Sequence, residues 1–310
     1  MAMNHPLYDV IIIGGGPAGL TGGIYTGRES LSTLLLEKGL CGGWPNLTGT
    51  IENYPGFPEG INGMDLAARL KAQAEKFGVE IREFEEVRKV VPGGEGIRVE
   101  TAKGGYRARS LIAAPGSRAR PLGVPGEREL LGKGVSYCAT CDGPLYREKE
   151  VAVVGGGNAA LEEALFLTRF ASRVHLVHRR DRFRGEKYVV GELEETGKVS
   201  FVMESVPVSI DGEKAVESLT VKNRAGGGET RLEVEGVFIF VGVDPNTECL
   251  RGAVELDGEG FILTDPEMLT SLPAAFAAGD ARSGNVRQIA AACGEGTVAA
   301  LGVRGLLVEY

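Results

Sequence analysis

Histidine, tryptophan and cysteine are scarce in this sequence, with three, one and five residues among 310. Cys41, Cys249 and Cys293 each stand alone, and an odd, mostly isolated set is not the paired framework of a small secreted protein. Only Cys138 and Cys141 lie close together, with two residues between them. We therefore interpret this pair as reactive rather than structural.

The sequence offers few cysteine and histidine residues that could bind a metal ion. Structural zinc usually takes four protein ligands, and Cys138 and Cys141 supply two. His175 and His178 lie on one predicted strand, where a spacing of three residues points side chains to opposite faces. The sequence therefore predicts no metal site.

The chain also lacks the marks of an exported or membrane protein. No basic segment precedes the first apolar run, YDVIII, and no run approaches the roughly 18 apolar residues of a membrane span. Acidic residues outnumber basic ones by 42 to 34, for a net charge of −8. Such a charge disfavours nucleic acid and anionic membranes as partners. We expect a cytoplasmic protein that binds neither.

Glycine, by contrast, is abundant, with 47 residues, and the first cluster forms a phosphate-binding fingerprint. The predicted strand Tyr8–Ile13 leads into Gly14, Gly16 and Gly19, which have the G-x-G-x-x-G spacing. These glycines allow a sharp turn, a close backbone approach to pyrophosphate and tight packing of helix on strand. Glu37 ends the second strand, 33–36, where a carboxylate can accept hydrogen bonds from a ribose. This segment predicts a dinucleotide site that suits FAD.

A second fingerprint begins after the predicted strand Val151–Val154. Gly155, Gly157 and Ala160 give G-x-G-x-x-A, a helix is expected over 159–168, and a second strand over 174–178. That strand ends without an acid, at a basic cluster made of His178, Arg179, Arg180 and Arg184. Guanidinium groups pair with an adenosine 2′-phosphate, which a carboxylate repels. The second site is therefore predicted to favour NADPH over NADH.

A short apolar strand near the C-terminus ends at Gly279 and Asp280, and a small-residue helix is expected from about Gly294. Asp280 could contact the ribityl chain of a flavin, or it could belong to an ordinary helix-capping turn. If it contacts flavin, an FAD domain is split in the sequence around an NADPH domain. The predicted fold class is α/β, with two Rossmann-like, three-layer ββα domains covering 1–116 with 244–310 (FAD) and 117–243 (NADPH).

The stretch CATCDG places Cys138 and Cys141 just before the second fingerprint. In a C-x-x-C loop a thiolate can form that attacks a disulfide or a flavin. Asp142 follows directly, and it either carries a proton to or from the leaving thiolate or braces the turn. A redox disulfide is the favoured interpretation.

Taken together, the motifs resemble those of the low-molecular-weight thioredoxin reductases of the bacterial, archaeal and plant type. The likeness covers essentially the whole chain and rests on GGGPAG, EKG, IENYPGF, CATCDG, GGGNAALEEA, HRRDRFR, PNT, AAGD and RQ. It implies a homodimeric FAD enzyme whose two domains rotate relative to one another. Electrons would pass from NADPH to FAD, then to the Cys138–Cys141 disulfide, and then to thioredoxin or a thioredoxin-like protein. Cys141 would lie next to the flavin, Cys138 would attack thioredoxin, and Asp142 would be the general acid.

Fingerprints and resemblance together define the expected cofactor contacts. Those for FAD are Gly14, Gly16, Pro17, Ala18, Glu37, Lys38, Gly42, Gly43, Asn53, Gly279, Asp280, Arg287, Gln288 and Ile289. Those for NADPH are Gly155, Gly157, Asn158, Ala159, Ala160, His178, Arg179, Arg180 and Arg184.

The sequence departs from the family pattern at three places. Trp44-Pro45 replaces a usual Gln-Leu, so the only tryptophan is expected near the flavin. Pro115 stands in the first domain crossing, where it removes a donor and restricts Ala114, and Val243-Asp244 replaces His-Ser in the second. Both changes at the crossings bear on how easily the domains rotate.

Three other functions compete with this interpretation. Two keep the fold: a flavin-dependent dithiol oxidase, and a reductase that takes electrons from a donor other than NADPH. The third is a non-catalytic, nucleotide-binding redox sensor. The arginine cluster disfavours the first two, and the intact C-x-x-C-D motif disfavours the third.

Overall fold

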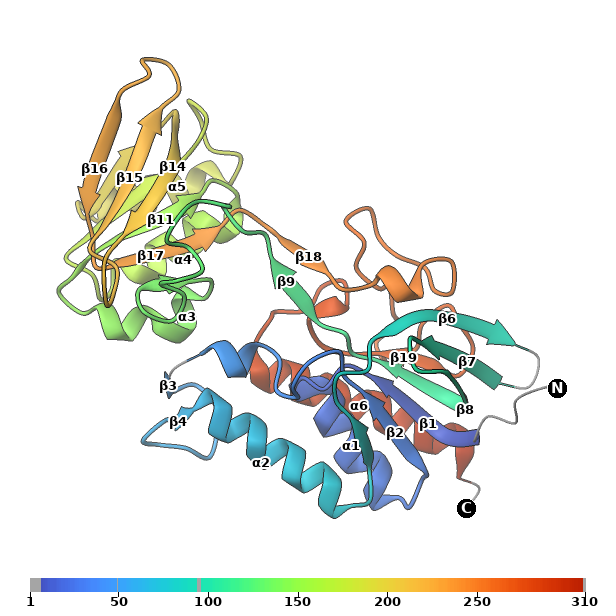
Figure 1. Cartoon of the computed structure of the whole chain (residues 1–310). Helices are drawn as coiled ribbons and strands as arrows, with labels where there is room; N and C mark the ends of the chain where they lie inside the picture. The colour runs from blue at the N-terminus through green and yellow to red at the C-terminus, as the bar shows by residue number, and fades with distance from the viewer. Residues whose placement is uncertain (1–6, 49, 94–95, 309–310) are drawn as a thin grey trace. The chain divides into compact units, whose positions relative to one another are not determined.

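The computed structural model describes residues 7–48, 50–93 and 96–308 (Figure 1). It divides into two compact units, called here unit 1 (Met1–Arg118 with Asp244–Tyr310) and unit 2 (Ala119–Val243). Unit 2 is therefore inserted into the sequence of unit 1. Which cofactor each unit binds stays a prediction.

Unit 1 is built on a mixed sheet with the strand order β5-β2-β1-β8-β7-β6, and β19 pairs with β8. Strands β1, β2, β5 and β19 continue a parallel ladder with β8, whereas β7 pairs antiparallel with β6 and β8. The bounds are β1 (Leu7–Ile13), β2 (Thr33–Leu36), β5 (Glu80–Arg82), β6 (Val87–Gly93), β7 (Gly96–Thr101), β8 (Gly105–Ala113) and β19 (Ala275–Ala277).

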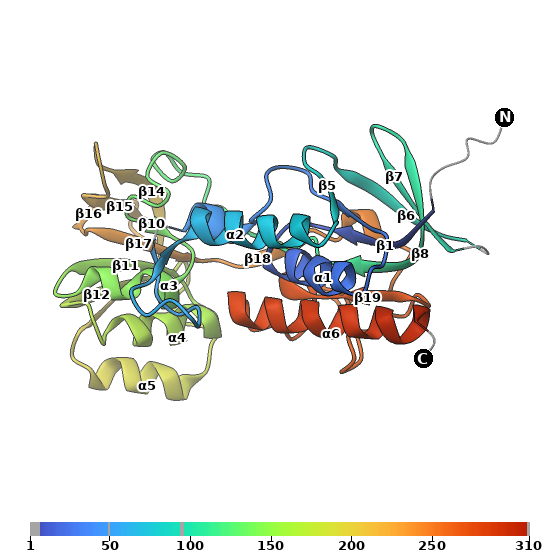
Figure 2. The same cartoon turned by 90° about the horizontal axis from the view of Figure 1, so that it is seen from below.

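Successive side chains of β1 point into two different hydrophobic cores, so this sheet is buried on both faces. Val10 and Ile12 pack into a core with the helices, while Ile11 and Ile13 pack into a second core with β6–β8 and the segment around 250–281. Figure 2 shows α1 and α6 side by side against the sheet. The helices are α1 (Pro17–Arg28), α2 (Gly63–Lys76) and α6 (Ile289–Leu307), and a small hairpin joins β3 (Thr50–Ile51) to β4 (Ile61–Asn62).

Unit 2 has a parallel sheet with the order β10-β17-β11-β12-β13. Helices cover one face, and an antiparallel sheet, β14-β15-β16, covers the other, with a separate core on each side. The parallel strands are β10 (Val135–Ser136), β11 (Glu150–Gly155), β12 (Arg173–Val177), β13 (Val199–Val202) and β17 (Gly236–Phe240). The other elements are α3 (Ala139–Asp142), α4 (Asn158–Leu167), α5 (Lys187–Glu195), β14 (Ser205–Asp211), β15 (Ser218–Asn223) and β16 (Glu229–Glu233).

The fold class expected from the sequence is confirmed: an α/β chain with two Rossmann-like, three-layer units, one inserted in the other. The expected start of the last helix was wrong. The last helix begins at Ile289, five residues before the expected Gly294, because the intervening segment is mostly alanine, the strongest helix former.

The two segments that join the units, β9 (Ser117–Ala119) and β18 (Val243–Pro245), pair as a two-stranded ribbon. On the unit 1 side, the Asn246 side chain donates to the Pro115 carbonyl at 3.0 Å, and the Trp44 indole donates to the Ser117 carbonyl at 3.1 Å. On the unit 2 side, the Arg120 amide donates to the Gly242 carbonyl at 2.9 Å. Trp44 and Pro115, both departures from the family pattern, thus contribute to holding the first crossing strand.

Helix α6 corrects the expectation that no segment is long and apolar enough for a membrane span. By length and composition it qualifies, with 19 residues and a mean hydropathy of 1.2. However, it packs against α1, where a Cβ on Gly296 would lie 2.2 Å from the Ala18 carbonyl oxygen, and its Glu295 pairs with Arg282 inside unit 1. These contacts are typical of a helix that packs against the other elements of its own domain.

Candidate cofactor-binding and redox sites

The first glycine turn has the shape that a pyrophosphate requires. Gly14 adopts a φ of +100°, and a Cβ there would lie 2.1 Å from the Ala114 carbonyl oxygen. Gly16, the N-cap of α1, has no atom within 4 Å of an added Cβ, and no side chain caps the helix. The N-terminus of α1 is therefore open beside Gly16, and an open, uncapped helix N-terminus is the arrangement that binds phosphate. The residues fit the FAD diphosphate.

Glu37 both braces this turn and lines the cavity beside it. Its carboxylate accepts from the Gly15 amide at 2.7 Å and from the Gly39 amide at 2.8 Å. The cavity, of about 360 Å³, lies at the carboxyl ends of β1 and β2, where α/β folds bind ligands. It is lined by Ile13, Gly14, Leu36, Glu37, Lys38, Glu86, Val87, Arg88, Pro115, Arg118, Asn246, Glu248 and Cys249. The expected contacts Gly14, Glu37 and Lys38 are therefore brought together.

Sequence reasoning missed Arg88 and Arg118 in this cavity. Arg88 lies at the start of β6, and Arg118 lies in the crossing strand, where it bonds Asn246 at 2.7 Å and Glu248 at 2.8 Å. Neither residue belongs to a glycine motif. Only the pairing of distant strands brings them to the cavity.

The C-terminal segment joins the first glycine turn, although more than 250 residues separate them. A Cβ on Gly279 would lie 3.0 Å from the Ala18 Cβ. The Gly279 amide donates to Glu295 at 2.8 Å, and Glu295 in turn pairs with Arg282 at 2.5 Å. Glu295 is a further site residue that the sequence analysis missed, because its role depends on the packing of α6.

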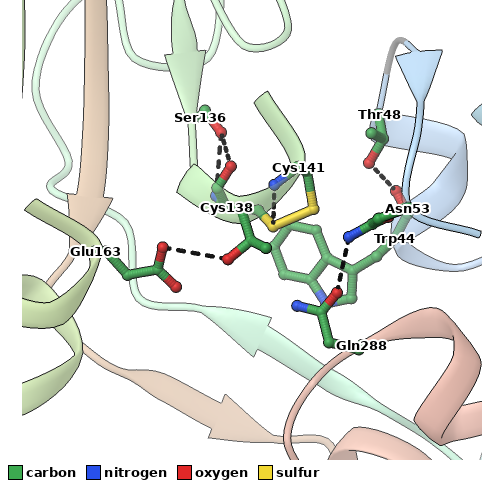
Figure 3. Close-up of a disulfide and its surroundings, with 9 residues drawn as sticks. Trp44, Thr48, Asn53, Ser136, Cys138, Cys141, Glu163 and Gln288 are labelled. Atoms are coloured by element: carbon green, nitrogen blue, oxygen red, sulfur yellow. Dashed lines mark hydrogen bonds between the residues drawn. A yellow bond between two sulfur atoms is a disulfide. The ribbon is translucent and has the colours of Figure 1, made fainter. Parts of the chain in front are cut away.

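Asp280 follows this turn in a largely buried position. Burial raises the pKa of its carboxyl to about 6, and the Glu295 charge adds to that effect while the Arg287 charge opposes it. Nearby, Asn53 donates to the Gln288 side chain at 3.1 Å (Figure 3). The Gly42 amide donates to the Gly15 carbonyl at 2.8 Å. The expected FAD contacts from both ends of the chain thus lie within unit 1.

The second glycine turn repeats this design in unit 2. A Cβ on Gly155 would lie 2.5 Å from the Ala160 Cβ and 2.6 Å from the Phe240 carbonyl oxygen. Gly157, the N-cap of α4, has open space where its Cβ would be, and no side chain caps the helix. The first residue of α4, Asn158, accepts from the Glu186 amide at 3.0 Å. The turn fits a nicotinamide dinucleotide diphosphate.

The basic cluster divides into two parts. Arg179, Arg180 and Arg184 are exposed on the loop after β12, and the Arg184 amide donates to the Gly156 carbonyl at 2.8 Å. Arg224, which the sequence analysis missed, donates to the Arg179 carbonyl at 3.1 Å. The exposed arginines are free to approach an anion at the carboxyl end of β12.

His178, by contrast, lies beneath the glycine turn, with 6% of its surface exposed. Its ring lies 2.1 Å from where a Gly156 Cβ would be, and its Nδ1 is 2.9 Å from the Gly155 carbonyl oxygen. Burial lowers the pKa of His178, which favours the neutral ring. The structure therefore gives His178 a supporting contact with the turn.

The cysteine pair forms a disulfide at the start of α3, with a Cα–Cα distance of 5.3 Å (Figure 3). Cys138 is the N-cap of this short helix, and its Sγ accepts from the Cys141 amide at 3.2 Å. Ser136 holds the Cys138 backbone, accepting from its amide at 3.0 Å and donating to its carbonyl at 3.2 Å. Once the disulfide opens, the Cys141 amide is placed to stabilise a Cys138 thiolate.

Two carboxyl groups lie around this loop. Asp142 is the last residue of α3, and burial raises the pKa of its carboxyl while a hydrogen bond with Ser136 opposes that rise. Burial also raises the pKa of Glu163 on α4, and Glu163 accepts from the Thr140 hydroxyl at 3.4 Å. Among the described residues, no cluster of three or more His, Cys, Asp or Glu side chains could hold a metal ion.

Comparison with known proteins identifies the family. The model of the pyridine nucleotide-disulphide oxidoreductases matches residues 8–296. The chain is 43% identical to the thioredoxin reductase of Listeria innocua over 300 residues, which is 96% of this chain and 93% of the relative. It is 41% identical to that of Bacillus subtilis, covering 99% and 96%.

A solved structure gives the same result. The thioredoxin reductase of Streptococcus pyogenes superposes with a TM-score of 0.92 at 42% identity, covering 97% of this chain and 98% of that one. The chain belongs to the thioredoxin reductases of this family. The resemblance inferred from CATCDG and the two glycine turns is confirmed, and the Cys138–Cys141 disulfide is the feature such a reductase requires.

Proposed function

We propose that this chain is a cytoplasmic, homodimeric thioredoxin-disulfide reductase that takes electrons from NADPH through FAD. The observation that carries the proposal is the Cys138–Cys141 disulfide on α3, in the same unit as a dinucleotide turn edged by exposed arginines. Unit 1 would hold FAD, and unit 2 would hold NADPH. When bound, the two cofactors supply the two-electron chemistry that reduces the disulfide.

The cysteines would then act in order. The Cys138 thiolate attacks one sulfur of the thioredoxin disulfide and forms a mixed disulfide, and the second thioredoxin sulfur leaves. Cys141 attacks Cys138, restores the Cys138–Cys141 disulfide and releases reduced thioredoxin. The 3.2 Å contact from the Cys141 amide to the Cys138 sulfur supports Cys138 as the attacking thiolate.

Asp142 would provide the proton for the leaving thioredoxin sulfur. Because burial raises the pKa of this carboxyl, the protonated form persists to a higher pH than for an exposed aspartate. The rate of the step should fall as the pH rises through that pKa, and Asp142→Asn should lose this limb of the pH profile.

Rotation of the units between half-reactions belongs to the proposal. The disulfide and the proposed nicotinamide site share unit 2, and both must reach a flavin held by unit 1. The paired strands β9 and β18 are the segments that must change conformation for the units to rotate.

The test follows reduction of a panel of thioredoxins, using the purified yellow protein with excess NADPH or NADH. Thioredoxin-dependent turnover with NADPH, absent in Cys138→Ser, is the expected result. Flavin that stays oxidised with both nucleotides would overturn the proposed donor, and electrons would then have to come from another donor or a dithiol.

A further inference from the structure

A buried carboxylate, that of Glu127, lies in unit 2 outside every motif that the function uses. Only 3% of the residue is exposed. Its oxygens accept three hydrogen bonds: from the Leu122 amide at 2.8 Å, the Gly123 amide at 2.8 Å and the Tyr137 hydroxyl at 2.7 Å. A buried carboxylate with this many donors is strongly tied to each of them, since losing a donor leaves part of its charge unsatisfied.

These donors come from two segments with different tasks. Leu122 and Gly123 follow the crossing strand β9, two residues after the Arg120 amide that bonds the Gly242 carbonyl. Tyr137 directly precedes Cys138. Glu127 therefore joins the segment by which the chain enters unit 2 to the segment that carries the redox disulfide.

Tyr137 is suited to transmit this restraint. Its ring packs, half-buried, against a core that includes Val135, Val237 and Ile239. Burial and the Glu127 charge both raise the pKa of Tyr137, so the phenol keeps its proton and remains a donor. The residue is held by apolar packing along the ring and by a charge-assisted hydrogen bond at its tip.

The restraint reaches the sulfur through the backbone. With Tyr137 fixed on one side and the Ser136 hydroxyl bonded to the Cys138 amide and carbonyl, little freedom remains at Cys138. In the disulfide form the Cys138 Sγ lies 3.2 Å from the Cys141 amide, the donor that would stabilise the thiolate.

We propose that Glu127 is a positioning residue of the redox centre, which acts through the Tyr137 hydroxyl to hold the Cys138 sulfur against the Cys141 amide. The role in turnover rests on the proposed function. The geometric effect on Cys138 does not, and it can be measured without NADPH or thioredoxin.

The test is Tyr137→Phe, which removes one oxygen and leaves the ring in its core. The holoprotein is reduced with dithiothreitol, the reductant is removed without oxygen, and alkylation by iodoacetamide at pH 7 is followed separately for Cys138 and Cys141 by peptide mass spectrometry. Tyr188→Phe is the matched control, because its hydroxyl also donates to a glutamate, Glu192, at 2.7 Å but on a residue that is 73% exposed.

We expect Y137F to alkylate Cys138 about three- to tenfold more slowly than wild type, which is the effect of weakening one hydrogen bond to a thiolate. Y188F should match wild type. In turnover, Y137F should slow thioredoxin reduction while flavin reduction by NADPH is unchanged. If wild type reduced no thioredoxin, the proposed function would fail, but the alkylation comparison would still decide the role of Glu127.

An unchanged or faster alkylation rate in Y137F overturns the proposal, because a loop that has only lost stability opens and exposes its thiols. Melting temperature and flavin absorbance show whether the variant folds. Should Y137F not fold, Glu127→Gln is measured in its place. It removes the charge that holds Tyr137, and the same slowing at Cys138 is expected.

Discussion

At the scale of single residues, we propose that the arginines after β12 set the preference between NADPH and NADH. Arg179 and Arg180 are exposed at the carboxyl end of the strand, beside the glycine turn. Their guanidinium groups can pair with a 2′-phosphate, which NADPH has and NADH lacks. The proposed role depends on the charge of these side chains and on their position after the strand, and both can be predicted from the sequence.

Replacing Arg179 and Arg180 by alanine should raise the KM for NADPH at least about tenfold, since two charge-assisted bonds are lost. The KM for NADH should stay nearly unchanged. Steady-state kinetics with both nucleotides measures this. Arg173→Ala, an exposed arginine at the opposite end of β12, is the control and should change neither. Equal losses for NADPH and NADH would contradict the assignment.

Asp280 makes the stability of the cofactor-free protein depend on pH. Its pKa is raised from the usual 3.8 to about 6 in the folded state. At a pH between these values Asp280 is already ionised in the unfolded chain but still protonated in the folded protein. The stabilisation is therefore fully present below about pH 4 and is lost as the pH rises through 6, by up to about 3 kcal/mol.

Asp280→Asn should remove this dependence. Urea unfolding at pH 4.5 and 7 would show a smaller difference between the two pH values in the variant than in wild type. A variant with the same pH difference as wild type would mean that Asp280 is not the group responsible.

At the scale of elements, each glycine turn has one position packed against neighbouring atoms and one with open space beside it. Gly14 is pressed against Ala114 and adopts a positive φ, whereas Gly16 has an ordinary φ of −76° and open space beside it. The motif predicts different tasks for the two glycines, and the contact of Gly14 with Ala114, just after β8, shows which of them cannot take a side chain.

Gly14→Ala should therefore lower the unfolding free energy of the cofactor-free protein by about 2 kcal/mol or more, through a clash and a strained backbone. Gly16→Ala should change it by less than about 0.5 kcal/mol. It should nevertheless weaken FAD binding at least about tenfold, because its methyl group occupies the space the phosphate approaches. Urea unfolding and flavin titration give the two quantities, and normal FAD affinity in Gly16→Ala would contradict the assigned site.

At the scale of the whole molecule, α6 leaves much of its apolar surface uncovered. Only 28% of the most apolar 18-residue stretch of this helix is buried. Its Val298 and Leu301 are 38% and 40% exposed. A helix that is apolar nearly all round is expected to be buried more fully than this. Dimerisation would account for the difference.

We expect light scattering to give twice the chain mass of 32.8 kDa for wild type and the single-chain mass for Leu301→Asp. Leu263→Asp, at a residue 41% exposed in unit 1 outside α6, is the control and should remain dimeric. A monomeric wild type would contradict the homodimer, and a dimeric Leu301→Asp would exclude this face.

The sequence by itself determined the two glycine turns, the redox pair and the α/β architecture. Each of these depends on residues within about 40 positions of one another, and local backbone geometry and hydrophobic periodicity are enough to specify them. Tertiary structure alone decided which distant residues complete the sites. Arg88 and Arg118 enter the cavity, His178 lies beneath its turn, and Glu127 accepts a hydrogen bond from the Tyr137 hydroxyl beside Cys138. Such contacts follow from strand pairing and helix packing, which bring together residues that no local pattern relates.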